Sequence, residues 1–341
     1  MKTSKIKNTI KAIARIVNRK TKLAILENVQ IEAGYIFASN LDIFVKLALP
    51  DNSLNTGYCL NFAELKKASE MFENINYLEN EAGKITFEAD EAKIKYSYTE
   101  TDNLFKPIEK AYNLAFEIGP DMAKLETACK FVSKDELRPQ MNYIAINNNH
   151  IVSTNAHFLY FDEIYFKQHG PDMADILISP QVIKIIKDIN TIGWTVYESE
   201  GYLKFTDGTN TIWQRPESNN FPNWQSILPQ NHETAITANK KELINEVKKA
   251  ANFNSIKTIA INANGTLKIE AKDEDINTEY SKELKDYSKV GPDIKIGFNA
   301  DYLNAILPEL ETETINIKLS GNNRAAIINN KFLLMPIIIN Y

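Results

Sequence analysis

The chain has 341 residues, of which 44% are hydrophobic and 24% charged, and its formal net charge is -5. This composition is typical of a soluble folded protein and excludes a disordered one, and the length exceeds one ordinary core, so we expect two or three domains. No apolar run approaches the roughly 20 residues that cross a bilayer, and the basic N-terminus lacks a signal-peptide core, so we expect a cytoplasmic protein with no membrane contact.

The first predicted helix, residues 5–18, separates apolar from basic side chains. The apolar face has the spacing of a helix packed on a core: Ile6, Ile10, Ile13 and Val17. The opposite face carries a cation every four residues, with a further lysine after the last: Lys7, Lys11, Arg15, Arg19 and Lys20. Solvated helix faces usually mix signs, because opposite charges four residues apart stabilise a helix. The row therefore suggests a polyanion-binding surface, with a plain solvated face as the alternative.

The elements that follow form a recognisable unit. Residues 28–39 alternate apolar and polar side chains around a turn, which predicts a β-hairpin. An amphipathic helix follows at 60–72, with Asn61 at its N-cap position, and a second strand pair is predicted at 84–98. The predicted order is helix, hairpin, helix and strand pair.

The chain repeats this unit twice more. The hairpin recurs at 142–154 and 258–269, and Ile31, Ile146 and Ile261 occupy the same place in each copy. The first helix recurs at 121–135 and 239–252, the second at 178–189 and 298–310, with Ser179 and Asn299 as N-caps, and the strand pair at 195–207 and 315–328. We therefore predict an α+β protein of three domains, at residues 1–118, 119–233 and 234–341.

Cations recur on the equivalent helices of the later copies. The outward positions hold Lys130, Lys134, Lys184 and Lys187 in the second copy and Lys241, Lys248 and Lys249 in the third. Glu126 and Glu242 dilute this surface. Lysine and arginine contact phosphates without base geometry, and no aromatic residues are interleaved for base stacking, so the pattern favours sequence-independent binding of double-stranded DNA.

Several segments together resemble the bacterial sliding clamp, the beta subunit of DNA polymerase III. They are KLAILENVQI (22–31), FVSKDELRPQMNYIAI (131–146), IVSTNAHFLYF (151–161), FPNWQSILP (221–229), IGFNADYL (296–303) and LLMPI (333–337). The resemblance spans the chain in order. It implies three domains of the DNA-clamp fold, each with two helices backed by antiparallel sheet, and a head-to-tail homodimeric ring whose helices face duplex DNA.

The resemblance also implies a cleft between the second and third domains. In the family this cleft accepts short hydrophobic peptides from the replicative DNA polymerase, the clamp loader and repair proteins. The corresponding residues are Thr154, Ala156, His157, Leu159, Pro222, Ile227, Leu333, Met335, Pro336 and Ile337. Apolar side chains with a soft methionine suit varied peptide anchors, although without the resemblance these would be interpreted as core or C-terminal strand residues.

The sequence departs from the family at this cleft. Residues 155–158 read Asn-Ala-His-Phe where members usually have Asp-Gly-His-Arg, Ser226 replaces a usual arginine, and the tail continues past Ile337. These differences predict an altered peptide specificity, consistent with a divergent, phage-borne or plasmid-borne member.

No catalytic constellation is recognisable. Cys59 and Cys129 stand in no CxxC or His/Cys cluster, the four histidines form no ligand pattern, and phosphate-loop and nucleophile-elbow motifs are absent. We expect a non-catalytic accessory subunit of DNA polymerase, with no metal and no cofactor. The alternative is a non-DNA protein-interaction scaffold of three α+β repeats.

Overall fold

The computed structural model describes residues 3–17, 23–49, 57–71, 75–81, 84–89, 92–98, 112–119, 121–147, 149–165, 175–199, 201–253, 257–275 and 277–339. The chain divides into two compact units. Unit 1 comprises residues 1–126, 143–149 and 164–220, and unit 2 comprises 127–142, 150–163 and 221–341. The boundaries of the three predicted domains stay a prediction.

Unit 1 combines most of the first copy with half of the second. Its helical segments are α1 (Thr3–Ile13), η1 (Ala24–Glu27), α2 (Phe62–Met71), the start of α3 (Met122–Ala128) and α4 (Pro180–Ile189). Its strands are β1 (Asn28–Glu32), β2 (Tyr35–Ser39), β3 (Ile43–Ala48), β4 (Tyr58–Asn61), β5 (Ile75–Glu81), β6 (Lys84–Ala89), β7 (Ala92–Ser97), β8 (Asn113–Ile118), β9 (Ile144–Asn147), β12 (Ile176–Ile178), β13 (Trp194–Ser199), β14 (Tyr202–Thr206) and β15 (Thr211–Gln214).

Unit 2 contains the third copy and the rest of the second. Its helical segments are η2 (Pro139–Asn142), η3 (Gln225–Ile227), α5 (Lys240–Asn252), α6 (Ala300–Ile306) and η4 (Leu307–Glu309). Its strands are β10 (His150–Thr154), β11 (Phe158–Glu163), β16 (Thr234–Asn239), β17 (Thr258–Asn264), β18 (Thr266–Asp273), β19 (Thr278–Glu283), β20 (Tyr287–Val290), β21 (Lys295–Asn299), β22 (Thr314–Leu319), β23 (Ala326–Ile328) and β24 (Phe332–Leu334).

The strand order repeats between copies, as the sequence predicts. The first copy begins β4-β1-β2-β3 and the third runs β21-β17-β18-β19, while β9 pairs with β12 and β10 with β11 in the second. The strand pairs within the described residues, such as β1–β2, β1–β4 and β17–β18, are antiparallel. Copies also join edge to edge inside each unit: β3 pairs with β15 in unit 1, and β11 pairs with β24 in unit 2.

The helix N-termini follow the predicted caps. The Ala63 N–H donates to Asn61 Oδ1 at 3.0 Å, the Gln181 N–H to Ser179 Oγ at 3.2 Å, and the Asp301 N–H to Asn299 Oδ1 at 2.8 Å. Such side-chain caps satisfy amides that have no partner within the first helical turn. The second-helix signals in all three copies are therefore confirmed.

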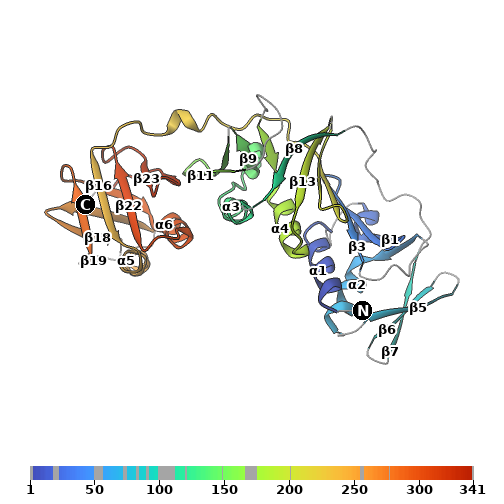
Figure 1. Cartoon of the computed structure of the whole chain (residues 1–341). Coiled ribbons are helices and arrows are strands. Elements are labelled where there is room, and N and C mark those ends of the chain that lie inside the picture. Colours follow the sequence, from blue (N-terminus) through green and yellow to red (C-terminus); the bar gives the residue numbers. More distant parts are fainter. Residues whose placement is uncertain are drawn as a thin grey trace. The chain divides into compact units, whose positions relative to one another are not determined.

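The helices pack against the sheets, and strand β18 of unit 2 shows polar side chains on the face away from them. In unit 2, α5 and α6 pack together, and α5 contacts β16, β17, β18 and β19 (Figure 1). Along β18 the buried side chains alternate with partly exposed Lys268, Glu270 and Lys272, which therefore point away from the helices. In unit 1, α1 lies beside α4 and also touches α2 (Figure 1).

The helix predicted at 121–135 is shorter than expected, because α3 ends at Ala128. Beyond it, Phe131 is 1% exposed and its ring lies 5.3 Å from that of Phe158 and 4.9 Å from that of Phe332. The Ser133 amide donates to the Met141 carbonyl at 2.9 Å. Burial of Phe131 in this aromatic cluster of unit 2 thus replaces the last helical turns, so the prediction was wrong over 129–135.

Candidate nucleic-acid interface and partner-binding site

The helix predicted at 5–18 ends at Ile13, so the prediction was wrong over 14–17. The two predicted faces are nevertheless present, and the basic face carries a buried acid from another helix. Ile10 and Ile13 are buried, while Lys7, Lys11 and Arg15 are exposed. Lys11 Nζ lies 2.8 Å from Asp188 Oδ1, and Arg15 Nε lies 2.8 Å from Asp188 Oδ2. Asp188 belongs to α4, so the two ion pairs join α1 and the turn that follows it, which holds Arg15, to α4 of the second copy.

The carboxylate of Asp188 is well enclosed, since its side chain is 3% exposed. Burial by itself would raise the pKa of Asp188, but the hydrogen bonds and charges of Arg15 and Lys11 outweigh it and lower the pKa below its usual value. Asp188 is therefore ionised at neutral pH and partly neutralises two of the predicted DNA contacts. Sequence analysis did not single it out.

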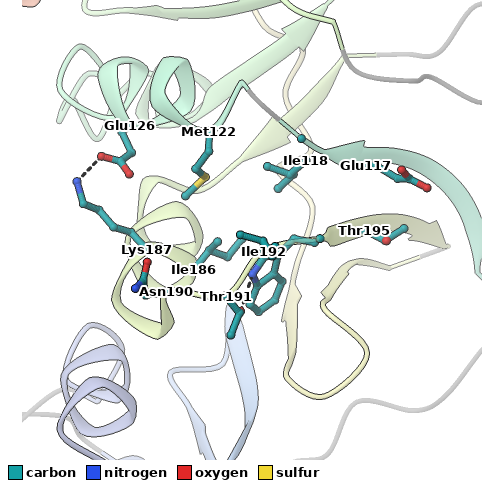
Figure 2. Close-up of a pocket in the computed structure, with 13 residues that line it drawn as sticks. Glu117, Ile118, Met122, Glu126, Ile186, Lys187, Asn190, Thr191, Ile192 and Thr195 are labelled. Atoms are coloured by element: carbon teal, nitrogen blue, oxygen red, sulfur yellow. Dashed lines mark hydrogen bonds and ion pairs between the residues drawn. The ribbon is translucent and has the colours of Figure 1, made fainter. Parts of the chain in front are cut away.

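A third ion pair joins α4 to α3. The Lys187 ammonium contacts the Glu126 carboxylate at the rim of a pocket of about 430 Å³ (Figure 2). The pocket lies between α3, the C-terminal end of α4 and β13, and its apolar lining includes Met122, Ile186 and Ile192. Helix α4 is thus tied by a lysine to α3 and by an aspartate to α1.

Helix α5 distributes its charges differently. Lys241, Lys248 and Lys249 are all exposed, and Lys249 Nζ lies 2.8 Å from Glu246 Oε1 on the same helix. Glu246, itself 4% exposed, also accepts a hydrogen bond from the Tyr280 hydroxyl of β19. Burial opposes ionisation of Glu246, but its hydrogen bonds to Lys249 and Tyr280 and the charges of Lys249 and Lys282 lower its pKa overall.

The predicted DNA-binding residues therefore fall into three sets. Those with a carboxylate partner are Lys11, Arg15, Lys130 (2.6 Å from Glu309 Oε2), Lys187 and Lys249. Those that are exposed and form no ion pair within the described ranges are Lys7, Lys134, Lys184, Lys241 and Lys248. Arg19 and Lys20 lie outside the described residues. Charge available to an anion is concentrated in the second set.

Strand β11 and the C-terminal segment bring several predicted partner-binding residues together. Leu159 pairs with Leu333 across β11 and β24, and each is 1% exposed. The Met335 amide donates to the His157 carbonyl at 2.9 Å. The Met335 side chain is 42% exposed. Leu159 and Leu333 are thus interior residues, whereas Met335 is available at the surface.

The tail then lies against β21. The Ile337 amide donates to the Gly297 carbonyl at 2.9 Å, and a Cβ built on Gly297 would lie 2.6 Å from the Ile337 carbonyl oxygen. Only glycine permits this approach of two backbones. Pro336 and Ile337 are half-buried in the tail.

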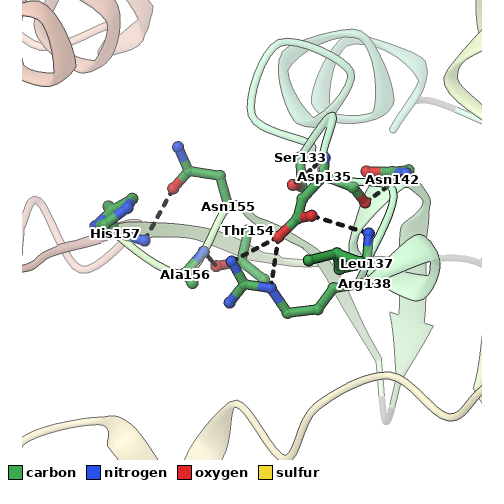
Figure 3. A network of polar contacts seen from close by, with 9 residues as sticks. All are labelled: Ser133, Asp135, Leu137, Arg138, Asn142, Thr154, Asn155, Ala156 and His157. Atoms are coloured by element: carbon green, nitrogen blue, oxygen red, sulfur yellow. Dashed lines mark hydrogen bonds and ion pairs between the residues drawn. The ribbon is translucent and has the colours of Figure 1, made fainter.

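The turn before β11 is built by side chains (Figure 3). Thr154 Oγ1 donates to the Phe158 carbonyl at 2.6 Å and accepts from the Ala156 amide at 3.1 Å. Asn155 Oδ1 accepts from the amides of His157 and Phe158. Ala156 has φ of 74°, a conformation that favours glycine. His157 is exposed and stacks on Tyr302 with ring centroids 5.8 Å apart.

Segment η3 is anchored to the same unit by Trp224. This side chain is 4% exposed and packs against His150 of β10 and Phe161 of β11. Ile227, at the end of η3, is 54% exposed, and Pro222 is half-buried. The tryptophan therefore fixes a segment that presents an apolar side chain to solvent.

Figure 3 also shows the loop at 133–138, to which the sequence analysis assigned no binding role. Asp135 accepts from the Leu137 amide at 2.9 Å and from Arg138 Nε at 2.9 Å, and these bonds lower the pKa of Asp135. Leu137 is 90% exposed. The Ser-Lys-Asp-Glu sequence that precedes Leu137 gives no signal of such exposure.

Three copies of a two-helix unit backed by antiparallel strands define the DNA-clamp class of fold. Residues 225–332 match the family model of the DNA polymerase III beta subunit, C-terminal domain. A beta sliding clamp of Rickettsia felis is 25% identical over 245 residues, which span 64% of this chain and 64% of that protein. The C-terminal match and this relative both point to the bacterial beta sliding clamps, and the aligned part of the chain spans less than two thirds of that relative's length.

Solved structures extend the likeness in fold over the whole chain. The sliding clamp of Bacillus subtilis superposes with a TM-score of 0.88 at 15% identity, covering 100% of this chain and 98% of that one. A Pseudomonas aeruginosa clamp, solved bound to griselimycin, gives a TM-score of 0.85 at 19% identity over 99% and 98% of the two chains. The predicted α+β clamp fold is confirmed.

Within the described residues, no helix is long and apolar enough to span a membrane. No group of three or more His, Cys, Asp or Glu side chains in that part of the chain is arranged to hold a metal ion.

Proposed function

We propose that this protein is a DNA sliding clamp, a non-catalytic processivity factor that encircles duplex DNA in the cytoplasm. The observation that carries the proposal is the placement of charge: exposed lysines recur on the helices of all three copies, while buried residues of the sheets face those helices. Rows of flexible cations bind phosphates without reading bases, which suits a protein that must move along any sequence.

Enclosure of DNA requires a closed ring, and we propose a head-to-tail homodimer. Negative-stain electron microscopy of the purified protein tests this directly. Class averages should show a six-lobed ring with a hole wide enough for a duplex roughly 20 Å across. Isolated three-lobed particles at the concentrations used for DNA binding would contradict the ring and favour a scaffold function.

The exposed side chains of Met335, Ile227 and His157 are proposed to receive short hydrophobic peptides of a replicative polymerase and of a clamp loader. A methionine adapts to varied apolar side chains, and Trp224 and the β11–β24 pairing hold the surrounding backbone in place. The probe is a fluorescein-labelled peptide with the C-terminal residues of the replicative polymerase from the same source.

Met335→Ala should weaken binding of this peptide at least about tenfold, because buried apolar anchors dominate such interfaces. Val290→Ala is a matched control, since Val290 is an equally apolar, 73% exposed side chain on β20 of the same unit. Equal affinities of the two variants would refute the assignment of the peptide site.

A further inference from the structure

Asp188 stands out on the helix surface because it is an enclosed acid that holds two of the cations proposed to face DNA. We propose that Asp188 acts as an internal phosphate mimic, which competes with DNA for Lys11 and Arg15 and so limits how tightly α1 holds a duplex. This inference rests on the proposed clamp function and assigns Asp188 as a positioning residue for it.

The geometry leaves both cations available for exchange. Each carboxylate oxygen of Asp188 takes one cation, and Arg15 is bound through Nε alone. The Nη groups of its guanidinium are therefore still able to donate to a phosphate. The Lys11 side chain is 63% exposed. Its ammonium has three N–H donors, and Asp188 Oδ1 occupies one of them.

The two sides of these ion pairs differ in mobility. The Asp188 side chain is short, is 3% exposed and projects from a helix whose neighbours Ile185 and Ile186 are buried. Lysine and arginine side chains have several rotatable bonds and lie at the surface, so they can turn from the carboxylate to a phosphate and return. The fixed partner is the acid, and the moving partners are the cations.

Exchange of this kind would smooth movement along DNA. Phosphates are discrete charges, so a cation on a sliding protein passes alternately close to and between them. Between phosphates, Lys11 and Arg15 can pair again with Asp188, so the free energy of the complex varies less from one position to the next. A carboxylate at this place also repels the duplex and weakens binding at every position.

The test compares wild-type protein with Asp188→Asn in binding a fluorescent linear duplex, followed by anisotropy from about 50 to about 200 mM salt. We expect Asp188→Asn to bind about three- to fivefold more tightly at the low-salt end, with the slope of log K against log salt steeper by about 1, as for one additional phosphate contact. Glu198→Gln is the matched control, because it removes one exposed carboxylate, on strand β13 of the same unit. It should behave as wild type.

The outcomes separate the inference from the clamp function. If wild-type protein shows no salt-dependent duplex binding, the proposed function itself fails. If wild-type protein binds and Asp188→Asn binds equally or more weakly, the phosphate-mimic role is overturned while the clamp function stands.

A double-mutant cycle of Lys11→Gln and Asp188→Asn distinguishes the proposed role from a purely structural role of Asp188, which would leave the effect of Lys11→Gln on duplex affinity the same in both backgrounds. Lys11→Gln should reduce duplex affinity less in wild-type protein than in the Asp188→Asn background, because Asp188 already occupies Lys11 in the former. If Asp188→Asn fails to fold, Lys7→Gln and Lys11→Gln are compared in the otherwise wild-type chain. Lys7 is exposed on the same helix without an ion pair among the described residues, so its loss should cost more affinity; an equal or smaller cost overturns the inference.

Discussion

Helices α1 and α5 open the first and third copies of the same unit, yet they hold their cations in opposite ways. Lys11 of α1 and Arg15 of the turn directly after α1 are paired with Asp188 of α4, an acid from another copy. On α5, Lys241 and Lys248 form no ion pair within the described part of the chain, and Lys249 is paired within its own helix. The number of basic residues therefore overstates the charge that α1 can offer to DNA.

Basic residues therefore have two different roles on these two helices. On α1 the cations contribute to packing between helices of two copies, because a buried carboxylate depends on them. On α5 the free cations contribute to the surface alone. Charge reversal at equivalent positions of a repeated fold can therefore have different effects. At one position it lowers the stability of the fold, and at the other it changes only the surface charge.

The largest expected effect comes from reversing the paired cations. Lys11→Glu with Arg15→Glu would place two acids beside the enclosed Asp188, so we expect the free energy of unfolding of unit 1 to fall by about 3 kcal/mol. The matched change on α5, Lys241→Glu with Lys248→Glu, should alter stability by less than about 0.5 kcal/mol. Hydrogen–deuterium exchange of the α1, α4 and α5 peptides measures both. Equal protection losses in the two double variants would break the comparison.

A smaller effect is expected at the buried acid of α5. Glu246→Ala leaves the Tyr280 hydroxyl without its acceptor, so we expect a loss of about 1–3 kcal/mol. Exchange of α5 and β19 amides should accelerate, and amides of unit 1 should be unchanged. The control is Glu283→Ala, because Glu283 is an exposed carboxylate on β19. Glu242→Ala is less suitable, since Glu242 accepts hydrogen bonds from the Lys285 and Asp286 amides.

Acidification should affect the α1–α4 contact in a predictable direction. Burial opposes ionisation of Asp188, but Arg15 and Lys11 lower its folded-state pKa below the unfolded value near 4. Its stabilising contribution is therefore complete above about pH 4 to 5 and is lost as the pH falls through the folded-state pKa. The melting temperature of wild-type protein should exceed that of Asp188→Asn at pH 7, and the gap should narrow below about pH 4. A gap independent of pH would contradict the ion pairs.

The smallest effect is a gain in stability outside the charged faces. Ala156 has φ of 74°, where alanine is strained and glycine is not, so Ala156→Gly should stabilise unit 2 by about 0.5–1 kcal/mol. Asn277→Gly is the matched control, because asparagine at φ of 50° already tolerates this region. Thermal unfolding distinguishes the two variants, and duplex affinity should change in neither. A loss of stability in Ala156→Gly would show that the turn depends on the alanine side chain.

Much of the fold could be predicted from local signals. Alternating hydrophobicity located the hairpins, and the N-cap residues Asn61, Ser179 and Asn299 located the second helices, because these features depend on neighbours in sequence. The pairing of β3 with β15 and of β11 with β24 depends on edges of strands from different copies, for which the sequence carries no local signal.

The candidate site shows the same limit. Exposure of the lysines on α5 followed from helical periodicity, but the partners of Lys11 and Arg15 are more than 170 residues away. One signal was present: Asp188 lies three residues after Ile185, on the apolar side of its helix, where an unpaired carboxylate would be costly. An acid on an apolar stripe indicates a cation from elsewhere in the chain.

The central claim, that the helices and not the outer faces of the sheets meet DNA, is tested most directly by duplex anisotropy at low salt. Lys241→Glu with Lys248→Glu changes exposed cations on α5, and Lys268→Glu with Lys318→Glu makes the same change in charge on β18 and β22, on positions that alternate with buried ones. We predict at least tenfold weaker binding for the α5 variant and a shallower salt slope, with the sheet variant within about twofold of wild type. Equal losses, or a larger loss in the sheet variant, would contradict the assignment.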